Sequence, residues 1–317
     1  MISNAVLFKS YKNWILNATV VESSRACRHK LHTWYFPDKQ ITRFFPNYFL
    51  QLKRMEKAIS TENTLFVNQA VFFKLLKLGK VPMPNEDSVF FTHLNESLYS
   101  KERQAEMLDL CKRVFVYNES SKQELVALGL NSKKVETVYG GVDRKIFFPS
   151  VSIPREEEFV LVVGDCKPRK NPELIRKVIS HLPEVKFIIH GNNWAHIFEG
   201  SSLPKNLEIR DFSFANQPTL IRSASAFLTL SRLEGGPYPT IEALASGTPV
   251  VASDTGWNRD VIPPGGGFII ENLDSLSEIC HKLMSAINLK SRVYATDLLH
   301  GALSWSELGK KIFELKF

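Results

Sequence analysis

Residues 230–262, LSRLEGGPYPTIEALASGTPVVASDTGWNRDVI, decide the fold class of this 317-residue chain. They begin at the end of an apolar run, residues 226–231, which predicts a buried strand. A Gly-Gly-Pro turn follows, then a helical pattern from Pro239 that stops at Gly247, and then a second apolar run, residues 248–253. Strand, glycine turn, helix and strand make one βαβ unit of a parallel sheet. In such sheets ligands bind beyond the carboxyl ends of the strands, where this glycine turn lies.

Two glutamates of this unit are the first candidate site residues. Glu234 lies on the turn, and Glu242 follows eight positions later in the first turns of the predicted helix. A carboxylate near a helix N-terminus also fits ordinary stabilisation by the helix dipole. However, free backbone N–H groups after Gly235 and Gly236 would form an anion site at the same end. A diphosphate on those amides would leave the carboxylates to bind sugar hydroxyls.

With SRLEGGP before it and EALASGTPVVAS after it, the glutamate pair resembles the donor-site signature of retaining GT-B glycosyltransferases of family 4. The resemblance implies an α/β fold with two Rossmann-like domains facing a cleft and a C-terminal helix that crosses back to the N-terminal domain. It implies that Glu242 binds the ribose of a nucleotide and that Glu234 contacts the transferred sugar. It also implies that the amides near Gly236 and Thr240 face the donor diphosphate.

Length and composition agree with a two-domain enzyme. The chain is long enough for two domains with a substantial core, and its 44% hydrophobic and 23% charged residues are typical of a soluble globular protein. No apolar run approaches the roughly 18–20 residues that cross a bilayer, and no signal-peptide pattern opens the sequence. The four cysteines lie far apart, which disfavours a zinc site or a disulfide framework. We therefore expect a cytoplasmic protein.

The net charge of +7 is concentrated near the N-terminus. Residues 1–150 carry 22 Lys and Arg against 14 Asp and Glu, whereas residues 151–317 carry 18 against 19. The stretch 41–55 combines four aromatic residues with basic ones, including Arg43, Lys53 and Arg54. This stretch fits a peripheral contact with the inner face of an anionic membrane and favours an acidic or lipid-linked acceptor. It also fits core aromatics beneath a solvated face. No motif for nucleic-acid binding accompanies it.

The remaining pattern predicts two domains of similar design. Residues 1–149 are the expected N-terminal Rossmann-like acceptor domain, and residues 150–303 the nucleotide-sugar donor domain. The boundary is expected in the polar stretch 150–158, which contains three consecutive glutamates. Residues 304–317 predict a helix capped by Ser304, which the resemblance implies will pack back on the N-terminal domain.

His93 is the predicted site residue of the first domain. It follows the apolar run 88–92 and therefore lies at the carboxyl end of a predicted strand. A histidine there is also compatible with an ordinary hydrogen-bonded strand end. The resemblance implies that His93 contacts the donor sugar near the reacting centre, so we predict His93 and Glu234 as the catalytic residues.

The loop after the apolar run 159–163 is the predicted phosphate site. Gly164 ends the strand, and Lys167, Arg169 and Lys170 follow it. Arginine can bind two phosphate oxygens in a fork, whereas lysine acts as a point charge. The resemblance implies that Lys170 binds the diphosphate. The family has an arginine directly after the glycine, but this chain has Asp165, so Arg169 or Lys167 would take that role.

The resemblance implies that these residues serve a hexosyltransferase that retains the anomeric configuration. No Asp-x-Asp motif occurs, so we expect no metal, and cations and backbone amides would meet the charge of the leaving group. We expect no cofactor, because the nucleotide-diphosphate sugar is a substrate. The resemblance implies that Gly191 and Asn192 lie near the nucleotide base. The acceptor would be a glycan, a lipid-linked sugar or a polysaccharide precursor.

Two other functions stay open. A regulatory GT-B subunit could bind nucleotide sugar without transferring it, which Asp165 and the lack of a glycine-rich loop after the first strand favour. A nucleotide-sugar 2-epimerase on a similar fold would release free nucleotide and an altered sugar without an acceptor. A dinucleotide-dependent oxidoreductase is disfavoured, because no Gly-x-Gly-x-x-Gly follows any predicted strand.

Overall fold

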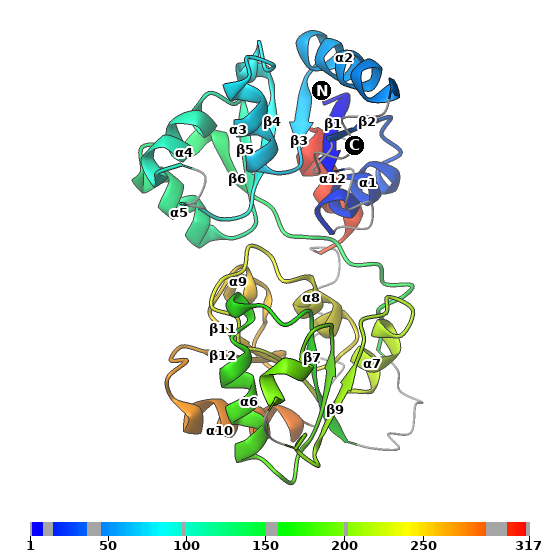
Figure 1. The fold of residues 1–317 in the computed structure, drawn as a ribbon, viewed down its shortest axis with the longest axis vertical. Helices are drawn as coiled ribbons and strands as arrows, with labels where there is room; N and C mark the ends of the chain where they lie inside the picture. The colour runs from blue at the N-terminus through cyan, green and yellow to red at the C-terminus, as the bar shows by residue number, and fades with distance from the viewer. Residues whose placement is uncertain are drawn as a thin grey trace. The chain divides into compact units, whose positions relative to one another are not determined.

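The protein is built from two compact units, shown in the computed structural model of Figure 1. The model describes residues 2–8, 15–36, 46–94, 96, 99–149, 158–199, 202–289 and 303–314. Unit 1 comprises Met1–Gly141 and Leu303–Phe317, and unit 2 comprises Val142–Ala302. The expected boundary was at residues 149–150, whereas the contacts divide the chain at 141–142. Arg222 of unit 2 explains the difference, because its Nη2 donates to the Ile146 carbonyl at 2.9 Å and its guanidinium lies over the Phe148 ring.

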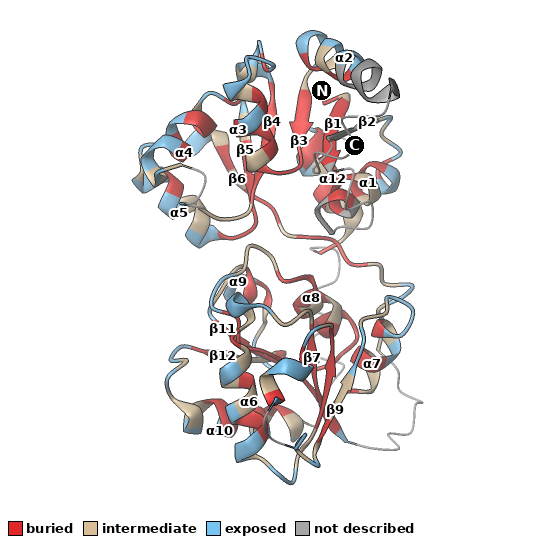
Figure 2. Cartoon of the chain, in the orientation of Figure 1, coloured by how far each residue is buried: buried red, intermediate tan, exposed pale blue. Residues whose placement is uncertain are grey.

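Unit 1 contains a six-stranded sheet in which all neighbouring strands are parallel, in the order β2-β1-β3-β4-β5-β6. The strands are β1 Asn4–Phe8, β2 His32–Phe36, β3 Thr64–Phe66, β4 Ser88–Phe91, β5 Arg113–Val116 and β6 Val135–Thr137. The helices are α1 Ile15–Ala26, α2 Pro46–Thr61, α3 Gln69–Lys77, α4 Lys101–Asp109, α5 Glu119–Ala127 and α12 Trp305–Phe313. Figure 2 shows the central strands buried between these helices.

Unit 2 repeats this design with the strand order β12-β11-β10-β7-β8-β9, again all parallel. Its strands are β7 Phe159–Val163, β8 Lys186–His190, β9 Leu207–Arg210, β10 Ala226–Thr229, β11 Val250–Ser253 and β12 Gly267–Ile270. Its helices are α6 Pro172–His181, α7 Gln217–Ser223, α8 Tyr238–Ala245, α9 Asn258–Val261 and α10 Leu276–Ile287. Every residue of β7 is buried, as expected for a parallel strand that helices cover on both faces. The predicted α/β fold of two Rossmann-like units is confirmed.

Helix α12 completes unit 1 although it follows unit 2 in the sequence. Figure 1 shows it beside α1. The two helices approach so closely at Gly309 that an added Cβ would lie 2.5 Å from Cys27 Sγ and 2.5 Å from the Ser23 carbonyl oxygen. Arg113 at the start of β5 binds the far end of α12, where Nη1 lies 3.0 Å from the Glu314 carboxylate. This position of the last helix agrees with the expected fold.

The starts of two helices are defined by the residues around them. The N-cap of α5 is Asn118, whose side chain accepts a hydrogen bond from the Ser121 N–H at 2.7 Å. Helix α8 begins at Tyr238, one residue before the predicted Pro239. No helix in the described part of the chain combines the length and the apolarity needed to cross a membrane.

Candidate functional site

The candidate site of unit 2 begins where β7 and β8 end. Gly164, directly after β7, has a φ of +119°, which favours glycine over residues with a side chain. Gly191, directly after β8, lies so near that an added Cβ would be 2.0 Å from the Gly164 carbonyl oxygen. The same oxygen accepts a hydrogen bond from Trp194 Nε1 at 2.8 Å. The two predicted glycines therefore bring the loops after β7 and β8 into contact.

An ion cluster around the nearly buried carboxylate of Glu234 joins three of the predicted site residues. Arg169 and Lys170 end a short 3-10 turn, Pro168–Lys170, between β7 and α6, and Glu234 lies on the turn after β10. Arg169 Nη1 and Lys170 Nζ each lie 2.6 Å from Glu234 Oε1. The Glu234 side chain is 9% exposed and that of Lys170 is 14% exposed. Parallel pairing of β7 with β10 brings these two loops to the same edge of the sheet.

The charges of this cluster set the ionisation of Glu234. Burial alone would raise the pKa of its carboxyl group, but the nearby charges of Lys170 and Arg169 outweigh burial and lower the pKa. Glu234 is therefore ionised at neutral pH. Two cations facing one carboxylate leave a net positive charge, which suits the binding of an anion.

Glu242 on α8 has opposite surroundings. It is half-buried, and its Oε2 accepts a hydrogen bond from Gln217 Nε2 at the start of α7. Burial raises the pKa of Glu242 to about 7, and the hydrogen bond from Gln217 acts in the other direction. Unlike Glu234, this carboxylate faces a neutral amide. Its charge can therefore change near neutral pH.

The start of α8 is held by tight packing and hydrogen bonds. An added Cβ on Gly236 would lie 2.4 Å from the Trp257 ring, and Trp257 Nε1 donates to the Pro237 carbonyl at 3.2 Å. The Thr240 N–H donates to the same carbonyl at 3.0 Å, and the Thr240 hydroxyl donates to Asn258 at 2.8 Å. Because α8 begins one residue earlier than predicted, the Thr240 amide lies within its first turn and is already paired. The expected contact of the amides near Gly236 and Thr240 with a diphosphate stays a prediction.

Asp165 connects two loops. Its Oδ1 accepts a hydrogen bond from Asn192 Nδ2 at 2.8 Å, and the Cys166 N–H donates back to the Asn192 carbonyl at 2.9 Å. Lys167 Nζ lies 4.0 Å from the other carboxylate oxygen. The acidic residue at the position of the family's arginine is thus engaged with the loop after β8. Asn192, predicted near the base, holds this arrangement together.

The predicted residues of unit 1 that the structure describes lie just after β4 and on α2. His93 follows β4 by two residues and is half-buried, and its carbonyl accepts a hydrogen bond from Gln69 Nε2 at 2.8 Å. Lys53 and Arg54 are exposed on α2. Arg43 lies outside the described residues.

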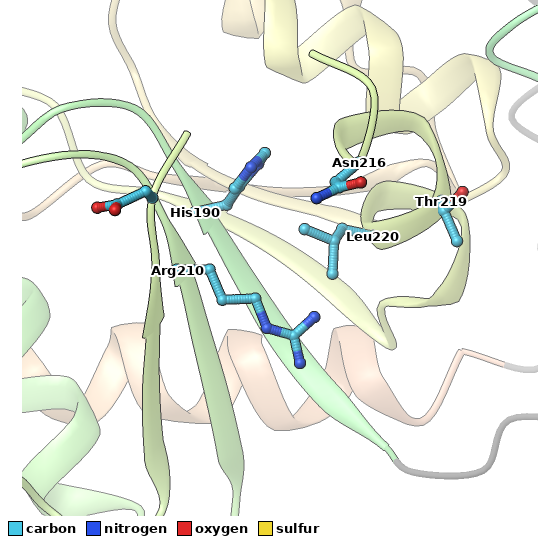
Figure 3. Close-up of a pocket in the computed structure, with 6 residues that line it drawn as sticks. His190, Arg210, Asn216, Thr219 and Leu220 are labelled. Carbon is cyan, nitrogen blue, oxygen red and sulfur yellow. The ribbon is translucent and has the colours of Figure 1, made fainter. Parts of the chain in front are cut away.

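A cavity of about 260 Å³ lies at the ends of β8 and β9, beside α7 (Figure 3). It is lined by His190, Arg210, Asp211, Asn216, Thr219 and Leu220. The Ser213 N–H donates to His190 Nε2 at 2.9 Å. Burial, and then the charge of Arg210, lower the pKa of His190, so the ring is neutral at physiological pH. No local sequence pattern indicates this cavity, because its lining residues come from β8, β9 and the region of α7.

Gln217 was also missed as a site residue. In the sequence it marks only the start of a short helix, and no local pattern indicates that it faces Glu242, 25 positions away. In the described part of the chain, no three His, Cys, Asp or Glu side chains come together as metal ligands would.

Comparison with known proteins finds a family similarity within unit 2. Residues 143–295 match the family model described as glycosyl transferases group 1, a range that lies within unit 2. The D-inositol 3-phosphate glycosyltransferase of Mycobacterium tuberculosis (strain ATCC 25618 / H37Rv) is 25% identical over 174 residues, which cover 48% of this chain and 36% of that protein. The match therefore spans little more than a third of this curated relative.

Solved structures share the fold of the chain. The Anabaena protein HepE, in complex with UDP and glucose, is similar with a TM-score of 0.75 at 13% identity, covering 99% of both chains. A sucrose-phosphate synthase from Thermosynechococcus elongatus is similar with a TM-score of 0.76, also at 13% identity, covering 99% of this chain and 98% of that one. At such low identity these similarities show the fold alone.

Proposed function

We propose that this chain, whose residues 143–295 match the family model of glycosyl transferases group 1, is a retaining hexosyltransferase. It moves a sugar from a nucleotide-diphosphate sugar to an acceptor hydroxyl and uses no metal ion. The observation that carries the proposal is the ion cluster of Arg169, Lys170 and Glu234, which offers a net positive charge at the carboxyl ends of the strands. Such ends are where parallel α/β sheets bind ligands.

The two cations are proposed to bind the donor diphosphate. Negative charge develops on the leaving diphosphate in the transition state, and prearranged cations stabilise it there. Lys170 is nearly buried and fixed by Glu234, so its ammonium group is held in position before the donor binds. Arg169 has a more exposed side chain and can turn to grip two oxygens. Glu234 then accepts hydrogen bonds from hydroxyls of the transferred sugar.

The nucleoside is proposed to extend from α8 towards the cavity beside α7. Glu242 would accept hydrogen bonds from the ribose hydroxyls. Gln217 contacts Glu242, and its sequence neighbour Asn216 lines the cavity, so the base would lie beyond Asn216 and near Gly191. Uridine is the first nucleoside to test, because the similar HepE structure contains UDP.

The proton of the acceptor hydroxyl is proposed to pass to the leaving diphosphate. Glu234 is a poor general base, because the charges of Lys170 and Arg169 keep its pKa low against the effect of burial. Reaction on the same face of the sugar gives retention without a protein nucleophile. His93 of unit 1 would bind the sugar near the reacting carbon. The lack of an Asp-x-Asp motif in the sequence supports the metal-free mechanism.

The decisive experiment measures binding and turnover together. The protein is heated with UDP-, GDP-, ADP- and dTDP-sugars in the presence of EDTA, and release of nucleoside diphosphate is followed with and without a panel of glycan acceptors. A donor at 100 times its dissociation constant should stabilise the fold by about 2.7 kcal/mol. Retained configuration in the product supports the proposal.

Other outcomes select another function. Binding without release of nucleotide over the whole acceptor panel would indicate a regulatory subunit. Release of free nucleotide with an altered sugar and no acceptor would indicate a 2-epimerase. No thermal shift with any donor contradicts nucleotide-sugar binding altogether.

The acceptor is proposed to be acidic or lipid-linked, with the enzyme at the inner face of a membrane. Lys53 and Arg54 are exposed on the same turn of α2 and could contact anionic head groups. Sedimentation with phosphatidylserine liposomes tests this, using a Lys53→Glu, Arg54→Glu double variant. A Lys112→Glu, Lys133→Glu double variant, at two other exposed lysines of unit 1, is the control with the same change of charge. Unchanged sedimentation of the double variant would remove the membrane from the proposal.

A further inference from the structure

Gln217 is a polar residue in a position where helix packing favours apolar ones. It is the first residue of α7 and only 4% exposed. Its Nε2 donates to Glu242 Oε2 on α8, the helix against which α7 packs. Burying an amide costs free energy unless the amide is hydrogen-bonded. The hydrogen bond to Glu242 offsets part of this cost.

The two ends of the Gln217 amide have different surroundings. Its Nε2 has Glu242, whereas its Oε1 is buried and, among the described residues, has no hydrogen-bond partner. A reversed amide would direct an acceptor at a carboxylate oxygen, which only a protonated Glu242 could satisfy. In the observed orientation the amide favours the charged form of Glu242. It also occupies one carboxylate oxygen and leaves the other free to accept hydrogen bonds.

We propose that Gln217 is a positioning residue for the donor, because its amide holds one carboxylate oxygen of Glu242 and leaves the second oxygen to accept hydrogen bonds from the ribose hydroxyls. This rests on the proposed binding of a nucleotide sugar. A carboxylate held in this way can accept hydrogen bonds from the 2′ and 3′ hydroxyls of a ribose. It forms no such bonds with a sugar that lacks these hydroxyls, so that sugar binds more weakly. The pair therefore selects ribonucleotide donors over donors that lack the 2′ and 3′ hydroxyls.

The surroundings of Glu242 make Gln217 important for its charge. Burial and the Gln217 hydrogen bond are the two influences on the pKa of Glu242, and they act in opposite directions. Helix α7 carries one ionisable side chain, Arg222, whose guanidinium lies over the Phe148 ring and donates to the Ile146 carbonyl. Strand β11, which also packs on α8, carries none. Loss of Gln217 therefore leaves burial to raise the pKa of Glu242 further.

Calorimetric binding of UDP, GDP and ADP to wild type and to Gln217→Leu tests this inference. Leucine keeps most of the volume but removes the amide. Loss of a hydrogen bond to a charged group should weaken binding about tenfold or more at pH 7. The pH at which binding is half lost should also move upward, because the ionised form of Glu242 becomes scarcer in the variant. Ser223→Ala, at the other end of α7, is the control for folding and basal activity.

Two further measurements separate positioning from simple structural support. The 2′,3′-dideoxy nucleotide should bind wild type and Gln217→Leu equally, because it has no hydroxyl for Glu242. The Glu242→Gln, Gln217→Leu double variant should bind UDP no worse than Glu242→Gln alone. Equal weakening of the ribo and dideoxy forms, or wild-type binding by Gln217→Leu, overturns the inference and leaves the proposed function intact. Failure of the wild type to bind any of the three nucleotides overturns both.

Discussion

Glu234 and Glu242 lie eight residues apart on either side of the start of α8, yet the two regions treat a carboxylate in opposite ways. The turn before the helix surrounds Glu234 with two cations, which lower its pKa despite burial. The body of the helix buries Glu242 against a neutral amide, and its pKa rises to about 7. The same side chain thus has a fixed charge in one region and a variable charge in the other. The partners, and not burial itself, decide which.

The largest expected effect comes from removing a cation on the Glu234 side. Lys170→Ala should lower kcat/KM for sugar transfer by about 100- to 1000-fold, the loss expected when one preorganised group that stabilises developing charge is removed. Steady-state kinetics with the donor identified by thermal shift measures it. Lys177→Ala is the matched control, because that lysine is exposed on α6 and is not among the predicted site residues. Equal losses in both variants would mean that the buried position of Lys170 is unimportant.

The next effect concerns Glu242 and pH. Its pKa is about 7 in the folded state and about 4.5 in the unfolded chain, so the folded state holds the proton more tightly. Stability should therefore fall as pH rises from about 4.5 to about 7, by up to about 3 kcal/mol at 1.36 kcal/mol per pH unit. Glu242→Gln should lack this fall, and urea unfolding across the pH range measures the difference.

Asp87 of unit 1 should make a similar contribution to the pH dependence of stability. Burial raises its pKa to about 7 as well, although its Oδ1 accepts a hydrogen bond from the Thr64 N–H. Wild type and Glu242→Gln share this contribution, so it cancels when the two are compared. Parallel curves for the two proteins would contradict the assigned protonation of Glu242.

A smaller loss is expected when Glu234 is neutralised. Glu234→Gln leaves the nearly buried Lys170 without its carboxylate, which should reduce the free energy of unfolding at pH 7 by about 2 kcal/mol. The contribution of Glu234 is present above its unfolded pKa and disappears as pH falls, because its folded pKa is lowered. Glu173→Gln, in an exposed pair with Arg176, is the control. A variant as stable as wild type at pH 7 would show that the cluster does not stabilise the fold.

The smallest effect on the free energy of unfolding is expected for the exposed ion pairs of Arg259 in unit 2. Arg259 bonds Asp254 at 2.7 Å and Glu271 at 3.2 Å, with its side chain half in solvent. Arg259→Ala should change the free energy of unfolding by less than about 1 kcal/mol, because exposed ion pairs contribute little. Thermal unfolding at low and high salt measures it. A loss as large as that of Glu234→Gln would contradict the distinction between buried and exposed clusters.

Most of the fold was predictable because its central strands are buried on both faces. Runs such as Phe159–Val163 are apolar throughout and are bounded by glycine, which distinguishes them from their surroundings. The resemblance to the family's donor-site signature led to the prediction of Glu234 and Glu242 as site residues.

The contacts of the candidate site were less predictable than its residues. Lys170 and Glu234 were both named, but their ion pair depends on β7 lying next to β10, which no local pattern reveals. Asp165 was interpreted as a charge reversal at the phosphate site, whereas it is bonded to Asn192 on the next loop. Gln217 had no sequence signal at all. Each of these depends on tertiary neighbours, which periodicity and spacing do not encode.

The position of α12 has a consequence for the order in which the protein is made. Arg113 at the start of β5 donates to the Lys311 carbonyl at 2.7 Å and holds the end of a helix that is translated after all of unit 2. On the ribosome, unit 2 is therefore synthesised completely before unit 1 has its last helix. Until unit 2 has been synthesised, the surface of α1 that α12 covers stays exposed, and chaperones can bind it.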